Sequence, residues 1–132
     1  MGKEIYYICY PNENLLEAKQ LNKEIKALKG ETRFIEYGEY DECVNPIKDI
    51  LKALNESTAV IVIHSDYTNK SMLSQIEITY ATNKNLKKYM VQVGKVRFSD
   101  SIAWGQEAKK IIKDSNMKFV AKKILDSEGE AN

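Results

Sequence analysis

Short apolar runs alternate along this chain with stretches in which apolar residues recur every three or four positions. The most apolar run, Ala59–Ile63, is typical of a parallel strand that is buried on both faces of a sheet. Four strands are predicted from such patterns, at 5–10, 32–37, 58–64 and 88–93. A fifth is expected at either 95–98 or 117–120, although the latter segment also has helical spacing.

The stretches between the first strands predict amphipathic helices. The first helix has Asn12 or Asn14 as its cap and ends at Gly30. Its apolar stripe consists of Leu15, Ala18, Leu21, Ile25 and Leu28. The second helix has Asn45 as its cap and Pro46 at its first position. Its stripe consists of Ile47, Ile50, Leu51 and Leu54.

Two more helices are expected in the second half of the chain. One follows the strand at 58–64 and extends to about Asn83. The other begins near Asp100 or Ser101, and its apolar positions are Ile102, Ala108, Ile111 and Ile112. Residues 126–132 resemble a frayed tail.

Alternating strands and helices require right-handed crossovers and a parallel sheet that is covered on both faces. At 132 residues the chain fits one domain, so we predict a single α/β domain at 1–126 and a flexible tail at 127–132. The expected architecture is three-layered and flavodoxin-like, with strand order 2-1-3-4-5. In that order a crevice opens between the carboxyl ends of the first and third strands, and residues 10–14 and 65–71 are expected to line it.

Composition narrows the class of partner. The chain has 20 basic and 19 acidic residues, a net charge of +1, and therefore no electrostatic footprint for nucleic acid or an anionic membrane. No apolar run approaches membrane-spanning length, and no signal-peptide block precedes the first strand. Cys9 and Cys43 make neither a disulfide framework nor a metal quartet. We expect a reduced, cytoplasmic protein that binds neither nucleic acid nor membrane.

The loop after the first strand excludes several common ligands of α/β sheets. A dinucleotide fold needs a glycine-rich turn there, whereas residues 9–14 contain no glycine. The same absence argues against a flavin-phosphate site. Glu13 is the only acid in this loop, which argues against a phospho-acceptor receiver domain. No group of His, Cys, Asp and Glu has metal-ligand spacing, so no metal and no bound cofactor are expected.

Glu77 is the residue that most suggests chemistry. On a helix that starts beyond the central strand, it falls on the same face as Leu73, Ile76 and Tyr80. One interpretation is a capping box, in which Ser74 caps the helix and Glu77 reaches back to its backbone. The other starts the helix near Ser71, so that Glu77 projects from the second turn toward the crevice. The residues alone leave both interpretations open.

Around this carboxylate the sequence resembles a Toll/interleukin-receptor (TIR) domain. After its central strand that family has an aromatic residue and then Ser-x-Trp-Cys-x-x-Glu. Tyr67 is the aromatic residue here, and the four motif positions are occupied by Ser71, Leu73, Ser74 and Glu77. Leucine thus replaces the usual tryptophan, and serine the usual cysteine.

Two flanking segments carry weaker parts of the same resemblance. The strand at 5–10 resembles the first box of the family, although Asn12 and Glu13 stand where the family often has aspartates. Ala103 and Trp104 resemble its late Phe-Trp box, with alanine in place of phenylalanine. The order of elements matches over about the whole chain.

The resemblance implies chemistry on NAD. Many bacterial and plant TIR domains cleave its nicotinamide–ribose bond, releasing nicotinamide with ADP-ribose or a cyclic ADP-ribose signal, often in antiphage defence. The glutamate that matches Glu77 is their catalytic residue. One carboxylate suits this bond, because nicotinamide leaves as a neutral base and the transition state resembles a ribosyl oxocarbenium ion. The implied activity is that of an NAD nucleosidase or ADP-ribosyl cyclase, with NAD as the substrate.

The resemblance also suggests residues that contact the substrate. Ser71 would shape the ribose pocket and Leu73 would form a wall. Tyr10 or Tyr67 would stack on an aromatic ring, and Asp66 is a candidate second acid. The whole predicted set is Tyr10, Asn12, Ser65, Asp66, Tyr67, Ser71 and Leu73. Family enzymes often become active only when self-assembly joins two protomers, so self-association through TIR–TIR contacts is expected.

Two alternatives remain beside this interpretation. A nucleoside deoxyribosyltransferase-like enzyme also has a parallel sheet and a glutamate on a helix, which it uses as a covalent nucleophile. The usual lead into that glutamate is Asp-x-Gly-Thr, whereas residues 70–73 contain no glycine. A non-catalytic TIR module would use the same fold only to assemble with partners, and Glu77 would then be replaceable.

Overall fold

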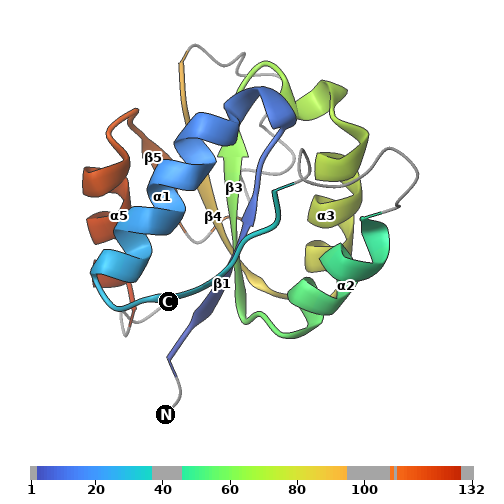
Figure 1. Ribbon diagram of the computed structural model, residues 1–132, viewed down its shortest axis with the longest axis horizontal. Coiled ribbons are helices and arrows are strands. Elements are labelled where there is room, and N and C mark those ends of the chain that lie inside the picture. The colour runs from blue at the N-terminus through green and yellow to red at the C-terminus, as the bar shows by residue number, and fades with distance from the viewer. Residues whose placement is uncertain (1–2, 37–45, 95–107, 109, 129–132) are drawn as a thin grey trace.

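A computed structural model shows a five-stranded sheet between two layers of helices (Figure 1). The structure describes residues 3–36, 46–94, 108 and 110–128. The strands are β1 Ile5–Cys9, β2 Glu31–Arg33, β3 Ala59–His64, β4 Lys87–Gln92 and β5 Lys110–Lys113. All four neighbouring pairs are parallel, in the order β2-β1-β3-β4-β5. The predicted flavodoxin-like order is therefore confirmed.

Among the described residues, two helices cover each face of the sheet (Figure 1). Helices α1 (Leu15–Ala27) and α5 (Met117–Asp126) pack on one face, and α2 (Ile47–Asn55) and α3 (Met72–Asn83) on the other. Two short 3₁₀ turns, η1 (Asn12–Asn14) and η3 (Thr68–Lys70), follow the carboxyl ends of β1 and β3. None of the helices in these described ranges is long and apolar enough to cross a membrane.

Side chains of β1 alternate between the two layers of the core, as a pleated strand requires. Tyr6 and Ile8 pack with α1 and α5, whereas Tyr7 and Cys9 pack with α2 and α3. All six residues of β3 are buried, because this central strand has neighbours on both edges and helices on both faces. This alternation decides on which side of the sheet Tyr7 and Cys9 lie.

The structure corrects two of the predicted strands. The second ends at Arg33 instead of Tyr37, and Phe34 beyond it stacks on the Tyr10 ring. The fifth is β5, where helix had been predicted around Ile111 and Ile112. Only Ile112 of this pair is buried and Ile111 is 44% exposed, which is the alternation of an edge strand. The predicted strand at 95–98, Trp104 and most of the helix predicted to begin near residue 100 lie outside the described residues.

Helix ends also differ from the predictions. The left-handed residue after α1 is Lys29, with φ of 66°, and the following Gly30 donates its N–H to the carbonyl of Ile25 at 2.9 Å. Leu28 is 49% exposed and so does not join the buried stripe. Pro46 is the residue before α2 rather than its first helical residue. The predicted cap Asn45 lies outside the described residues.

The last described segment is a helix, which settles the alternatives for residues 117–120. The Asn116 side chain accepts hydrogen bonds from the N–H groups of Lys118 and Phe119, and so caps α5. Of the predicted tail at 127–132, the structure describes two residues. Ser127 is fully buried, and Glu128 accepts a 2.5 Å hydrogen bond from the Tyr6 hydroxyl.

Candidate active site

Helix α3 begins immediately after Ser71. The Ser71 hydroxyl accepts a 3.1 Å hydrogen bond from the N–H of Ser74, as expected of a cap. The capping-box interpretation, with Ser74 as the cap, is therefore wrong. The buried face of the helix also differs from the predicted face, because Ile76, which was predicted to share the face of Glu77, is only half-buried. The stripe consists of Ser74, Glu77, Ile78 and Ala81.

Two serine substitutions test this helix start. We expect Ser71→Ala to lower the free energy of unfolding by about 1 kcal/mol, because the N–H of Ser74 loses its acceptor. Ser74→Ala should leave it nearly unchanged, because the buried Ser74 hydroxyl has no hydrogen-bond partner among the described residues. Urea unfolding of both variants measures the difference. A larger loss for Ser74→Ala would restore the capping box.

Glu77 lies between α3 and β1 and is fully buried. The Tyr7 hydroxyl donates a hydrogen bond to Oε2 of Glu77, and Sγ of Cys9 lies 3.6 Å from Oε1. The two donors stand on adjacent same-facing positions of β1, so one strand holds both carboxylate oxygens. Sequence reasoning missed both partners. The available signal was the period of two along β1, which places residues 7 and 9 on one face.

The Glu77 carboxylate affects the pKa of the Cys9 thiol. Burial first, and then the negative charge of Glu77, raise the pKa of Cys9 well above its usual range. Cys9 thus remains a protonated thiol at neutral pH. It can donate to Glu77, but it is a poor nucleophile and a reluctant proton donor.

This raised pKa predicts a loss of stability at alkaline pH. Above the usual thiol pKa of about 8.5, the unfolded chain releases the Cys9 proton while the folded chain retains it. The unfolded state then binds fewer protons, so the free energy of unfolding falls as pH rises, by up to about 1.4 kcal/mol per pH unit. Urea unfolding of Cys43→Ser, with and without Cys9→Ala, should show a steeper fall when Cys9 is present. Equal slopes would contradict the raised pKa.

A second group of predicted residues lines a pocket at the carboxyl edge of the sheet. The pocket has a volume of about 390 Å³. Its lining residues are Asn14, Glu17, Ser65, Asp66, Tyr67, Val93, Gly94 and Ser115. Three of the predicted contact residues, Ser65, Asp66 and Tyr67, therefore line this pocket. Such a position beyond the ends of β1 and β3 is where open α/β sheets bind ligands.

The other predicted contacts lie elsewhere. Tyr10 is fully buried, its ring stacks on Phe34 at 5.4 Å and its hydroxyl donates to the carbonyl of Ile35 at 2.5 Å. Its ring is therefore not open to a ligand, contrary to the prediction. Asn12 is exposed in η1 and does not line the described pocket. Leu73 is half-buried and packs against the core under α2 and α3.

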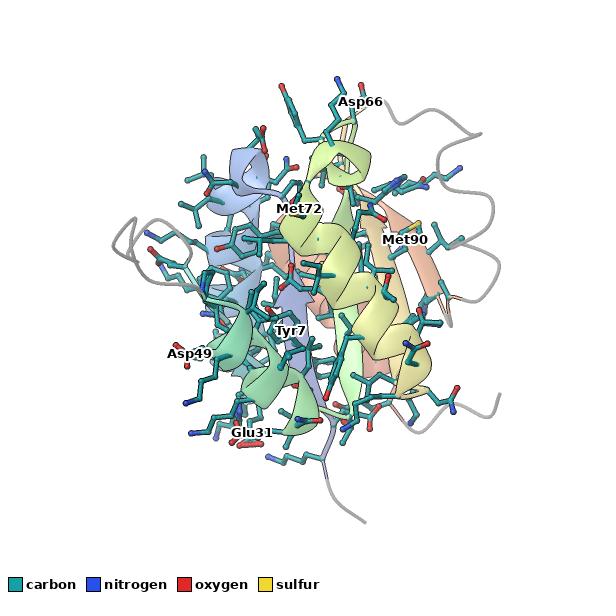
Figure 2. All side chains as sticks on the ribbon, turned by 90° about the vertical axis from the view of Figure 1, so that its right-hand side faces the viewer. Tyr7, Glu31, Asp49, Asp66, Met72 and Met90 are labelled. Carbon is teal, nitrogen blue, oxygen red and sulfur yellow. The ribbon has the colours of Figure 1, made fainter. Side chains whose placement is uncertain are left out.

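Glu77 and the pocket occupy different layers of the molecule. Glu77 and Tyr7 belong to the face covered by α2 and α3, whereas Glu17 of α1 and Val93 belong to the opposite face. Figure 2 shows Tyr7 part-way along the sheet and Asp66 beyond its carboxyl end. One interpretation of the sequence placed Glu77 in the same crevice as Asp66. The structure thus divides the predicted site in two.

No protein-family model and no characterised protein sequence matches this chain. Solved structures do match in fold. CMP N-glycosidase BcmB from Clostridium botulinum is 14% identical, with a TM-score of 0.63 over 92% of this chain and 98% of that one. Diflavin flavoprotein A3 from Nostoc sp. is 10% identical, with a TM-score of 0.56 over 96% and 92%.

A third match is a 3-dehydroquinate dehydratase-like protein from Bifidobacterium longum. It is 18% identical, with a TM-score of 0.52 over 98% of this chain and 100% of that one. These three proteins carry different functions on similar folds, so the likeness defines the class as a flavodoxin-like α/β protein and goes no further. The resemblance to TIR domains stays a prediction.

Proposed function

We propose that this protein is an N-glycosidase that cleaves the bond between ribose C1′ and the base nitrogen of a nucleotide, with Glu77 as its catalytic carboxylate. The observation that carries the proposal is the buried Glu77, which receives hydrogen bonds from Tyr7 and Cys9. A buried carboxylate costs stability, and hydrogen bonds from a hydroxyl and a thiol offset only part of that cost. Its retention there is accounted for by a task at that position.

The chemistry asks little else of the protein. As the C1′–N bond breaks, its electron pair leaves with the base and positive charge develops on the ribosyl ring. A carboxylate held in low-dielectric surroundings stabilises that charge more than it stabilises the neutral sugar of the ground state. Tyr7 and Cys9 would fix the position of the Glu77 carboxylate. Water then adds to C1′, or a second atom of the substrate does so and closes a ring.

NAD is the substrate that this arrangement favours. Its pyridinium leaves as neutral nicotinamide without being protonated, whereas a pyrimidine base departs as an anion unless an acid supplies a proton. Cys9, with its raised pKa, is poorly suited to supply one. The resemblance at Ser71 and Glu77 to TIR domains supports the same substrate, with a role in bacterial defence.

A pyrimidine nucleotide is the second candidate. The CMP N-glycosidase is similar in fold over nearly the whole of both chains. The N-glycosidic bond of CMP belongs to the same chemical class as the nicotinamide–ribose bond. CMP is therefore the natural second substrate to test.

Access to Glu77 requires a change in the protein, because the side chain is fully buried. A ribosyl ring can reach the carboxylate only when α3 or its neighbours shift. We propose that self-association brings this about, which would make the specific activity rise with protein concentration. A dilute preparation would then be nearly inactive.

The test is product analysis by chromatography and mass spectrometry over a range of protein concentrations. Wild type and Glu77→Gln are each incubated with NAD, CMP and cytidine. Nicotinamide release by the wild type alone supports NAD cleavage, and the accompanying product distinguishes hydrolase from cyclase. Cytosine release from CMP supports the second candidate, and exchange of bases between nucleosides would indicate a transferase. No turnover at any concentration would leave a non-catalytic module.

A further inference from the structure

The 390 Å³ pocket beyond β1, β3 and β4 has polar features that the proposed chemistry at Glu77 does not use. It lies on the side of the sheet covered by α1 and α5, and Glu77 is not among its lining residues. Its volume is that of a small-molecule site, for which about 300–1,000 Å³ is usual. The pocket can therefore be considered independently of the glycosidase.

Asn14 presents a buried amide to this pocket. The residue is 6% exposed, and its Oδ1 accepts a 2.6 Å hydrogen bond from the Ser65 hydroxyl. That hydroxyl already accepts from the N–H of Tyr67 at 3.2 Å, so its one proton is directed to Asn14. The amide is thereby oriented, with Oδ1 occupied. Its Nδ2 makes no hydrogen bond to any residue in the described ranges, which leaves a donor for a ligand oxygen.

The acidic side chains of the pocket determine the charge of the ligand that it can bind. Oε2 of Glu17 is shielded from solvent and has no hydrogen-bond partner among the residues that the structure describes, so a ligand reaches it only when this half-buried side chain rotates into the pocket. The exposed carboxylate of Asp66 lines the same space. None of the lining residues that the structure describes is a lysine, arginine or histidine. A buried carboxylate oxygen without a partner is costly, and a cationic donor offsets that cost most effectively.

We infer that this pocket binds a small organic amine that carries a hydroxyl or carbonyl oxygen close to its ammonium group. The ammonium group binds between Glu17 and Asp66, and the oxygen accepts a hydrogen bond from Nδ2 of Asn14. The two carboxylates repel phosphates and carboxylates. A metal ion is disfavoured because Asn14 presents a donor, whereas metal ions need acceptors.

The test is a titration followed by ¹H–¹⁵N NMR at mildly acidic pH, where amines are protonated. Ethanolamine and glucosamine are the cationic probes, and ethylene glycol and glucose are their neutral counterparts. We expect only the amines to shift the side-chain amide signals of Asn14 and the backbone signals of Gly94 and Ser115. Equal shifts from the neutral compounds, or none from the amines, would overturn the inference. Competition by Mg²⁺ would indicate a metal site instead.

Charge-neutral variants connect the shifts to the two acids. Glu17→Gln should weaken amine binding by about tenfold, because a charge-assisted hydrogen bond is replaced by a neutral one. Asp66→Asn should have a smaller effect, because its carboxylate is exposed to solvent. The control is Glu13→Gln, an exposed acid of η1 outside the pocket lining. Unchanged affinity in Glu17→Gln, with the spectrum of a folded protein, would refute the role of that carboxylate.

Discussion

Replacing Glu77 by glutamine is expected to abolish glycosidase activity while leaving the protein folded. Glutamine has the same shape but cannot offer a full negative charge to a ribosyl cation, so the rate should fall by about 10³-fold or more. The free energy of unfolding should stay within about 1 kcal/mol of the wild type, because the buried charge and its desolvation cost are removed together. The measurements are initial rates on NAD and CMP, with urea unfolding of the same samples.

The two measurements together distinguish a catalytic role of Glu77 from a structural one. If Glu77 has only a structural role, Glu77→Gln should lower the free energy of unfolding, and the folded fraction should keep any activity. A catalytic Glu77 gives the opposite pair of results. The matched control is Glu13→Gln, which changes an exposed acid by the same atoms and should alter neither quantity. Retained activity in folded Glu77→Gln would remove Glu77 from the mechanism.

Among the substitutions proposed for this protein, Tyr7→Phe is expected to lower the free energy of unfolding most. The substitution removes the hydroxyl that donates to Oε2 of Glu77, and leaves a buried carboxylate oxygen without that partner. The expected cost is about 2–3 kcal/mol, because a charged acceptor loses a donor in the core. Urea unfolding with an unchanged m-value would show that stability, and not compactness, has changed.

A double-mutant cycle attributes that cost to Glu77. In a Glu77→Leu background the Tyr7 hydroxyl has lost this acceptor, so Tyr7→Phe should there cost little or nothing. Cys9→Ala is the comparison on the same strand, and it should cost less than Tyr7→Phe because a thiol is a weak donor. Equal costs of Tyr7→Phe in both backgrounds would show that the hydroxyl acts through other contacts.

The sheet order could be predicted because the signal for it is local. Continuous burial of Ala59–Ile63 and helical stripes between short strands leave few topologies once crossovers must be right-handed. The edge strands were harder. At β5, Ile111 and Ile112 follow Ala108 at helical spacing, and only the register against β4 shows that Ile112 alone is buried. A four-residue edge strand carries too little pattern to compete with that spacing.

The candidate site was predicted in part. Glu77 was identified from its apolar surroundings, and Ser65, Asp66 and Tyr67 from their place beyond the central strand. Their separation into two layers was not foreseen, because a position along a helix does not by itself give the direction of the side chain. The hydrogen bond from Tyr7 crosses 70 residues of sequence and depends on the packing of α3 against β1.

The placement of α5 has a consequence for how this chain is made. Met117, Val120 and Ile124 complete the cluster that Tyr6 and Ile8 begin, and Glu128 accepts from the Tyr6 hydroxyl. This layer of the core therefore stays open until α5 has been synthesised, although β1 is made near the start of the chain. Until α5 has left the ribosome, that apolar surface remains exposed, and exposed apolar surface of this kind is prone to aggregation.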